Sequence, residues 1–227
     1  MKAWEWNTSL IHKIAFIKKH DDNTTHHLGF HTDRQYDSHR KEIEDLLEKD
    51  VIEECESAYE APVVLIPKPD GKTRLCIDYR KLNEIRVPDL HPLPRMDDLL
   101  QSAKHTTFMS TIDLKSGYHQ INVHPADRDK TAFLCLFGTF RFKRMPFGLR
   151  DAPATFQRLM DMFWRNLPAM AYLDDIIVLS PTFDQHLLDL ETVFLKLKDY
   201  KLQANRSKCH FACSRVKYLG LWIVAWN

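Results

Sequence analysis

The chain has 227 residues, of which 44% are hydrophobic and 28% are charged, and its formal net charge is +1 at pH 7. These values are those of an ordinary globular protein, long enough for one large domain or two smaller units, and the net charge alone does not indicate a nucleic-acid partner. With only 6 glycines and neither G-x-G-x-x-G nor G-x-x-x-x-G-K-[ST], the sequence does not predict a dinucleotide-binding or P-loop protein. Residues 1–10 contain no apolar signal segment and no apolar run reaches 18 residues, so we expect no secretion, no membrane partner and an intracellular location.

The charged residues and cysteines are unevenly distributed along the chain. Residues 141–165 include six basic and two acidic side chains, whereas residues 37–60 include ten acidic and three basic ones. The basic segment is compatible with guiding a phosphate backbone, but two solvated helix faces would give the same pattern. The five cysteines are irregularly spaced, which predicts reduced thiols, and Cys209, His210 and Cys213 lack the further ligand that a structural zinc site needs.

In chain order, the first predicted elements are a loosely ordered lead-in over residues 1–37 and a helix over 38–54 that Ser38 caps. A β-branched run predicts a strand over 62–66, and Asp70-Gly71 predicts the hairpin turn to a return strand over 73–79. A proline-rich stretch then leads to a short helix near 96–103.

The second half of the chain also mixes strands with helices. We expect strands at 108–114 and 121–123, a hairpin around Gly138 over 131–142, and a strand-rich end at 216–224. A helix is predicted to begin near Pro153 with Asp151 as its cap, and its core stripe comprises Phe156, Leu159, Met160 and Phe163. A second helix is predicted over 183–200, with an inward face of Leu187, Leu190, Val193, Phe194 and Leu197. Because strands and helices do not alternate regularly, the predicted fold class is α+β.

Two neighbouring acids, Asp174 and Asp175, interrupt the apolar runs 170–173 and 176–179. An unpaired buried carboxylate is costly, and a turn that binds divalent metal would compensate for it. Asp113 ends another strand-like run, and three such acids form the set that a two-metal phosphoryl-transfer enzyme needs. From the hairpin alone, ordinary surface turn acids are the favoured interpretation.

Seven blocks of the chain, in order, match one family. They are "APVVLIPKPDGKTRLCIDYRKLN" (61–83), "HPLPRMDDLL" (91–100), "IDLKSGYHQI" (112–121), "DKTAF" (129–133), "MPFGLRDAPATFQRLM" (145–160), "YLDD" (172–175) and "YLG" (218–220). In these blocks the chain resembles the reverse transcriptase domain of gypsy-type long-terminal-repeat retrotransposons. The resemblance implies a right-hand polymerase of fingers and palm subdomains over residues 38–227, ending before the thumb and ribonuclease H portions.

The resemblance also implies a function, an RNA-directed DNA polymerase that adds dNTPs to a primer on an RNA or DNA template. Asp113, Asp174 and Asp175 match the acids that hold two Mg²⁺ ions, with Mn²⁺ as a substitute, and Asp175 would be the weaker ligand. Tyr118 matches the aromatic residue beneath the sugar, where its ring would collide with a 2′-hydroxyl.

Further positions are implied as substrate contacts. The dNTP set is Lys68, Lys72, Arg74, Tyr118, Phe147 and Gly148, and the template and primer set is Asp78, Arg80, Gln157, Tyr218 and Gly220. Most have an ordinary structural alternative. It is a charged hairpin tip for the basic residues, a core tyrosine for Tyr118, a surface ion pair for Asp78 and Arg80, a polar helix face for Gln157, and a buried edge hairpin for residues 218–220.

The sequence departs from the family at Arg150-Asp151, where a small polar pair is expected. This departure and the expected truncation leave two alternatives to an active polymerase. One is an inactive relic or domesticated nucleic-acid-binding module of the same fold. The other is a different palm-fold enzyme, such as a nucleotide cyclase or an RNA-templated RNA polymerase, which Tyr118 opposes. The sequence gives no oligomeric state.

Overall fold

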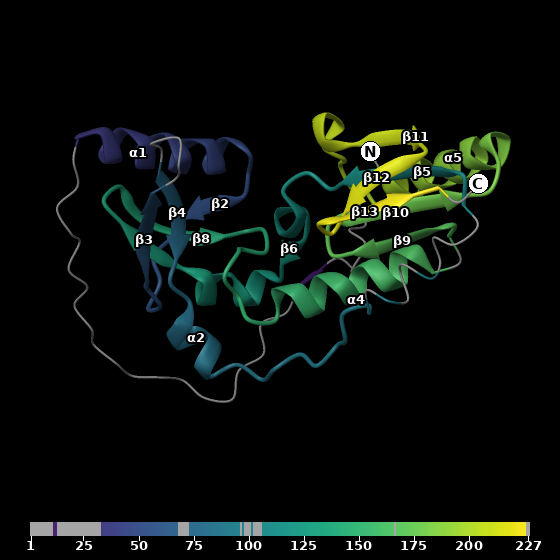
Figure 1. Ribbon diagram of the computed structural model, residues 1–227. Coiled ribbons are helices and arrows are strands. Elements are labelled where there is room, and N and C mark those ends of the chain that lie inside the picture. Colours follow the sequence, from purple (N-terminus) through teal and green to yellow (C-terminus); the bar gives the residue numbers. More distant parts are fainter. Residues whose placement is uncertain are drawn as a thin grey trace, which may run out of the picture. The chain divides into compact units, whose positions relative to one another are not determined.

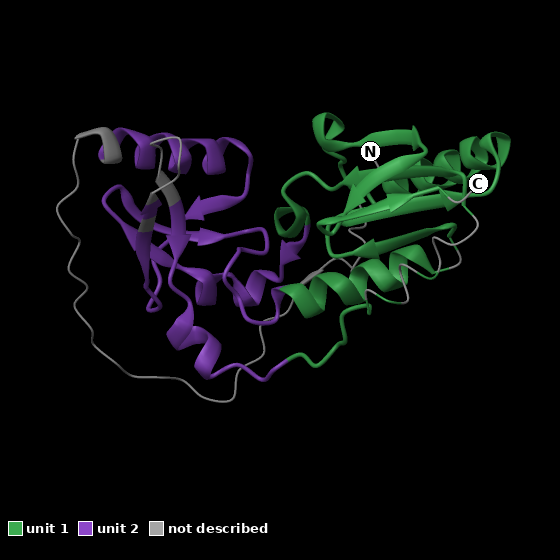
Figure 2. Cartoon of the chain, viewed as in Figure 1, with its two compact units in different colours: residues 1–9, 89–120, 153–227 green, residues 10–88, 121–152 purple. Residues whose placement is uncertain are grey.

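The computed structural model describes residues 11–12, 33–67, 73–95, 97, 101, 106–165 and 167–225. The chain divides into two compact units, drawn in different colours in Figure 2. Unit 1 comprises residues 1–9, 89–120 and 153–227, and unit 2 comprises residues 10–88 and 121–152. The chain therefore enters each unit more than once, and long-range contacts rather than a linker define them.

Unit 2 is built on a five-stranded sheet (Figure 1). Its order is β2 (Ile52–Glu54), β8 (Gly138–Phe142), β7 (Phe133–Cys135), β3 (Ala61–Pro67) and β4 (Thr73–Ile77). The β3–β7 pair is parallel and the other pairs are antiparallel. The predicted strand at 62–66 and its return strand are thus confirmed, although the Asp70-Gly71 turn lies outside the described residues.

The remaining elements of unit 2 correct two predicted boundaries. Helix α1 spans Asp33–Glu48 rather than 38–54, because the chain turns at Asp50 (φ 55°) and Val51 already leads into β2. A 3-10 helix, η3 (Pro125–Thr131), precedes β7, and Cys135 pairs with Gly138, so the hairpin turn consists of Leu136 and Phe137. Shorter elements are α2 (Arg80–Glu84) and the parallel pair β1 (Ile11–His12) and β6 (Asn122–Val123).

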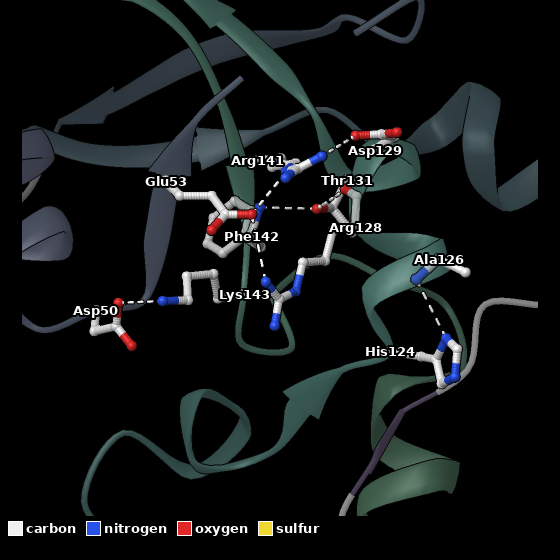
Figure 3. A network of polar contacts seen from close by, with 10 residues as sticks. All are labelled: Asp50, Glu53, His124, Ala126, Arg128, Asp129, Thr131, Arg141, Phe142 and Lys143. Atoms are coloured by element: carbon white, nitrogen blue, oxygen red, sulfur yellow. Dashed lines mark hydrogen bonds and ion pairs between the residues drawn. The ribbon is translucent and has the colours of Figure 1, made fainter. Parts of the chain in front are cut away.

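A polar network joins β2, β8 and η3 (Figure 3). Arg141 donates from Nε to Glu53 at 2.7 Å and from its terminal nitrogen to Asp129 at 2.5 Å, while Arg128 reaches Glu53 at 3.4 Å. Lys143 pairs with Asp50. Arg141 and Lys143 belong to the basic segment identified in the sequence, and these acids neutralise them locally, so that segment is less basic than its composition suggests.

Asp151, one of the two residues that depart from the family pattern, forms a buried ion pair in unit 2. Asp151 immediately precedes α4 (Ala152–Trp164), as predicted, and its carboxylate forms an ion pair with Arg86 at 3.0 Å. Both residues are buried, with 5% of Asp151 and 3% of Arg86 exposed. Two buried charges compensate for each other's desolvation only as a pair, so neither is expected to be replaceable alone.

Unit 1 contains a four-stranded antiparallel sheet (Figure 1). Its order is β11 (His210–Cys213), β5 (Phe108–Asp113), β10 (Asp175–Ser180) and β9 (Ala169–Tyr172). Helix α5 (Phe183–Asp199) packs against β5 and β10, and most of α4 also belongs to this unit. The hairpin of β12 (Arg215–Tyr218) and β13 (Leu221–Val224) shares a core cluster with Met109 and Ile177.

The predicted helix faces in unit 1 are confirmed for α4 and partly wrong for α5. All four stripe residues of α4 are buried. In α5, Leu190, Val193 and Leu197 are buried, but Leu187 and Phe194 are 50% and 41% exposed. The inward face of α5 instead includes two polar residues, His186 and Asp189, which a search for apolar periodicity does not select. The helix predicted near 96–103 lies largely outside the described residues.

His186 lies at the centre of a buried chain of hydrogen bonds. Ser180 donates its hydroxyl proton to Asp189 at 2.6 Å and accepts from Nδ1 of His186 at 2.8 Å. Nε2 of His186 is then the acceptor for the Ser110 hydroxyl at 2.7 Å, and Ser110 also accepts from the Ala212 amide. This arrangement accommodates a neutral imidazole, and burial lowers the pKa of His186 despite the nearby carboxylate of Asp189.

We expect acid to destabilise unit 1 through His186. Because the pKa is lowered in the folded state, the unfolded chain binds the proton more readily, and the free energy of unfolding falls as the pH drops below about 6.5. The loss amounts to about 1.4 kcal/mol for each unit by which the pKa is lowered. Urea unfolding at pH 7.5 and 5.5 measures it. His186→Gln should show a smaller pH dependence than the wild type, and equal dependence would contradict this role.

All five cysteines are free, and the Cys209 and Cys213 thiols contact backbone carbonyls of Asn205 and Phe211. Within the described ranges, every helix is too short or too polar to cross a membrane.

Candidate active site

The three predicted acids lie at adjacent strand ends in unit 1. Asp113 ends β5 and pairs directly with Asp175, the first residue of β10. Asp174 occupies the turn between β9 and β10, and its carbonyl accepts from the Leu114 amide at 2.9 Å. Side chains of directly paired residues leave the same face of a sheet with Cβ atoms about 5 Å apart. The register therefore places Asp113 and Asp175 side by side, and Asp174 lies in the adjoining turn.

The turn that carries Asp174 has an unusual backbone. Leu173 has φ 55°, a left-handed conformation that costs a non-glycine residue roughly 1–2 kcal/mol. Its amide donates to Oε1 of Gln157 at 2.8 Å, which helps to hold this conformation. Gly117 lies against the turn, and a Cβ atom there would stand 3.3 Å from Oδ2 of Asp174. The absence of a side chain at Gly117 thus leaves room for the Asp174 carboxylate.

The electrostatics of the turn are those of a site with excess negative charge. Burial, and then repulsion from Asp113, raises the pKa of Asp174. Burial, followed by repulsion from Asp174 and Asp113, raises the pKa of Asp175. Lys208 opposes both shifts, and its Nζ donates to Oδ2 of Asp113 at 3.2 Å. One ammonium group cannot balance three carboxylates, so the site favours a further cation.

A divalent cation fits this donor set only in part. Carboxylate oxygens are the ligands that Mg²⁺ prefers. Within the described part of the chain, however, no three His, Cys, Asp or Glu side chains form a ready-made metal site. Mg²⁺ commonly binds through one or two carboxylates together with substrate phosphates and water. The residues present fit that mode, in which the substrate completes the coordination.

Tyr118 lies beside the acids in η2 (Gly117–Gln120). Its ring contacts Phe156 edge to face, with centroids 5.4 Å apart. Burial raises the pKa of Tyr118 to about 12, and the nearby charge of Asp174 adds to the shift. The phenol therefore stays protonated at neutral pH, as a half-buried aromatic group next to the carboxylates.

In unit 2, the turn before α4 is held by a residue that the sequence analysis missed. Asn83 donates to the Gly148 carbonyl at 2.9 Å and accepts from the Arg150 amide at 2.8 Å. Gly148 has φ 90°, and a Cβ atom there would lie 3.4 Å from the Ile77 carbonyl oxygen. Phe147 is 49% exposed beside it. No local sequence signal distinguishes Asn83, because its partners lie far along the chain.

The structure describes only some of the other predicted contact residues of unit 2. Asp78 and Arg80 form a bidentate ion pair, with the shortest contact at 2.6 Å, as expected. Lys68 and Lys72 lie outside the described residues, and Arg74 is described only as backbone in β4.

Two residues predicted at the template and primer point inward. Gln157 is 0% exposed, and Tyr218 is 5% exposed, with its hydroxyl donating to the Asp175 carbonyl at 3.0 Å. Both side chains are covered by the protein itself, and the buried-hairpin alternative fits Tyr218. The template and primer roles of these two residues stay predictions. Gly220 lies in the exposed turn that follows (φ 84°). The exposed aromatic group of the hairpin is instead Trp222, whose ring stacks on Arg215 at 3.9 Å.

Solved structures support this arrangement of strands and helices. A foamy viral protease-reverse transcriptase in complex with dsDNA has a TM-score of 0.81 and 27% identity, and the match covers 94% of this chain and 44% of that one. The same viral protein in complex with an RNA/DNA hybrid has a TM-score of 0.80 and 27% identity, and the match covers 86% of this chain and 27% of that one. The predicted α+β fold with fingers and palm is therefore confirmed.

Sequence comparisons agree. The chain is 41% identical over 225 residues to the Retrovirus-related Pol polyprotein from transposon 297 of Drosophila melanogaster, covering 92% of this chain and 21% of the relative. It is 35% identical over 185 residues to the Transposon Tf2-3 polyprotein of Schizosaccharomyces pombe, and this match covers 80% of this chain and 14% of the relative. The chain thus spans about a fifth or less of these relatives. A family described as reverse transcriptase (RNA-dependent DNA polymerase) matches residues 66–223, and the chain belongs to that family.

Proposed function

We propose that this chain is the polymerase part of a retrotransposon Pol polyprotein and catalyses RNA-directed DNA synthesis. The reaction joins the α-phosphate of a dNTP to a primer 3′-hydroxyl and releases pyrophosphate. The single observation that carries the proposal is the pairing of Asp113 with Asp175 at the end of the unit 1 sheet, directly beside Asp174 in the adjoining turn. The family match and the nucleic acids named with the foamy viral structures support the same activity.

Two Mg²⁺ ions, or Mn²⁺ in their place, would be held by Asp113 and Asp174, with Asp175 as a weaker ligand. When bound, such ions supply Lewis-acid stabilisation of the attacking and leaving oxygens. Asp113 would have to exchange its contact with Lys208 for a cation. A backbone hydrogen bond supports this assignment, because the bond from the Leu114 amide to the Asp174 carbonyl fixes the turn relative to β5.

The other contacts follow the family assignment. Tyr118 would lie beneath the sugar, and Phe147 and Gly148 would lie behind the nucleotide, where Asn83 fixes the turn. Lys68, Lys72 and Arg74 would bind the triphosphate through charge and bidentate hydrogen bonds. Asp78, Arg80 and Gly220 are the proposed template and primer contacts, and Gln157 and Tyr218, both buried, would lie near these strands.

Primer extension on an RNA template tests the proposal. With Mg²⁺ and four dNTPs, the chain is expected to lengthen a DNA primer, and omission of the metal should abolish the product. Absence of extension with either Mg²⁺ or Mn²⁺, together with retained binding of the primer–template, would contradict the polymerase and support the inactive-relic alternative.

Tyr118→Ala is expected to relax sugar selection. Removal of the ring would create room for a 2′-hydroxyl and raise the efficiency of ribonucleotide incorporation relative to deoxynucleotide by on the order of 10²-fold, which corresponds to about 2.7 kcal/mol. Tyr118→Phe keeps the ring and should retain the selection. Single-nucleotide incorporation measures the ratio, which does not depend on how much protein is folded. An unchanged ratio in Tyr118→Ala would restrict the residue to packing.

A further inference from the structure

Gln157 is a fully buried amide on α4 that reaches the turn carrying Asp174. Its Oε1 accepts from the Leu173 amide at 2.8 Å, and its Nε2 donates to the Ala171 carbonyl at 3.1 Å and to Oδ1 of Asp161 at 2.7 Å. One side chain thus binds both the last part of β9 and the residue directly before Asp174. Apolar packing would not need these three directed bonds.

The orientation of the amide is set by chemistry as well as by geometry. The Ala171 carbonyl and the Asp161 carboxylate can only accept hydrogen bonds, so the nitrogen of Gln157 must face them. The oxygen then faces the Leu173 amide, which can only donate. Asp161 in turn contacts Nε2 of His91 at 2.7 Å with its other oxygen. A chain of polar contacts therefore runs from His91 through Asp161 and Gln157 to the turn.

We propose that Gln157, oriented by Asp161, is a positioning residue that holds Leu173 in its left-handed conformation and thereby places the Asp174 carboxylate. The effect on catalysis rests on the proposed polymerase function. Leu173 has φ 55°, so without the acceptor at its amide the turn would relax toward ordinary backbone conformations. Displacement of a reacting group by about 1 Å can lower a rate by 10²-fold.

Three variants test the orientation as well as the presence of the amide. Gln157→Glu keeps the acceptor for Leu173 but turns a second oxygen toward Asp161 and the Ala171 carbonyl, and we expect about a 30-fold loss in the maximal rate of nucleotide addition. Asp161→Asn can still accept from Gln157 and should change the rate less than threefold. In the double variant, the new amide of residue 161 can donate to the carboxylate of residue 157, and about tenfold of the loss should return.

The measurement is single-turnover nucleotide addition at several dNTP concentrations. The maximal rate should fall in Gln157→Glu, while the dNTP concentration for half-maximal rate and the primer–template affinity change less than threefold. Gln203→Glu is the matched control, because it makes the same chemical change at an exposed side chain of unit 1, and it should behave like the wild type. A loss of rate that the double variant does not reverse would contradict the orientation by Asp161.

Hydrogen exchange of residues 169–176 supplies a readout that does not need activity. Gln157→Met fills a similar volume without an acceptor, and the Leu173 amide should exchange at least tenfold faster than in the wild type. Unchanged exchange would overturn the inference whether or not the chain polymerises. If the wild type were inactive but the Leu173 amide still exchanged faster in Gln157→Met, only the proposed function would be contradicted.

Discussion

Asp174→Asn is expected to lower the rate of nucleotide addition by on the order of 10³-fold, equivalent to about 4 kcal/mol of transition-state stabilisation. The substitution keeps the size of the side chain and removes one of the anionic oxygens proposed to hold the metal. Burial and the charge of Asp113 raise the pKa of Asp174, so the charge is unfavourable for folding. Neutralising it should therefore leave the free energy of unfolding unchanged or higher.

A lower rate together with an unchanged or higher free energy of unfolding would separate an effect on catalysis from an effect on stability. Asp199→Asn makes the same change at an exposed carboxylate at the end of α5 and should leave the rate within twofold of the wild type. Rates from single-turnover primer extension and unfolding midpoints in urea are the two measurements. If Asp174→Asn retained a rate within tenfold of the wild type, Asp174 would not be a metal ligand in the reaction.

Asp151→Ala is expected to destabilise unit 2 by about 3–5 kcal/mol, because it removes the carboxylate partner of the buried Arg86 guanidinium. A typical domain has only about 5–15 kcal/mol of total stability, so this loss is a large part of it. The double variant Arg86→Met/Asp151→Ala removes both charges and should be more stable than Asp151→Ala alone.

Arg80→Ala supplies the control for that experiment. Arg80 also forms an ion pair in unit 2, but its side chain is 86% exposed and screened by water, so its loss should destabilise the protein far less than Asp151→Ala does. Equilibrium urea unfolding measures all the variants. A double variant that was less stable than Asp151→Ala would show that Arg86 contributes through contacts other than this ion pair.

The parts of the fold that the sequence predicts well depend on local patterns. The β-branched run of β3, the core stripe of α4 and the acidic hairpin each carry their signal within about ten residues, and all form as expected. Matching blocks in family order then identified the polymerase fold, which neither composition nor net charge indicated. The three acids could be grouped because each directly adjoins an apolar, strand-like run of the sequence.

The features that the sequence did not predict have a common physical cause in long-range contacts. The inward face of α5 is shifted because His186 finds hydroxyl partners on β5 and β10, and a polar residue with such partners can be buried. Gln157 and Tyr218 point inward because each hydrogen-bonds the backbone beside the acids. Lys208 reaches Asp113 across 95 residues of sequence. None of these partners is visible from neighbouring residues.

The central claim is that the carboxylates at the β5–β10 end bind the divalent ions of the reaction. Titration of Mn²⁺ into the chain with primer–template and a non-hydrolysable dNTP, followed by electron paramagnetic resonance of the free ion, tests it most directly. The wild type is predicted to bind two ions at this site, and Asp174→Asn is predicted to bind fewer, or to bind them at least tenfold more weakly. Equal numbers and affinities in both proteins would contradict the account.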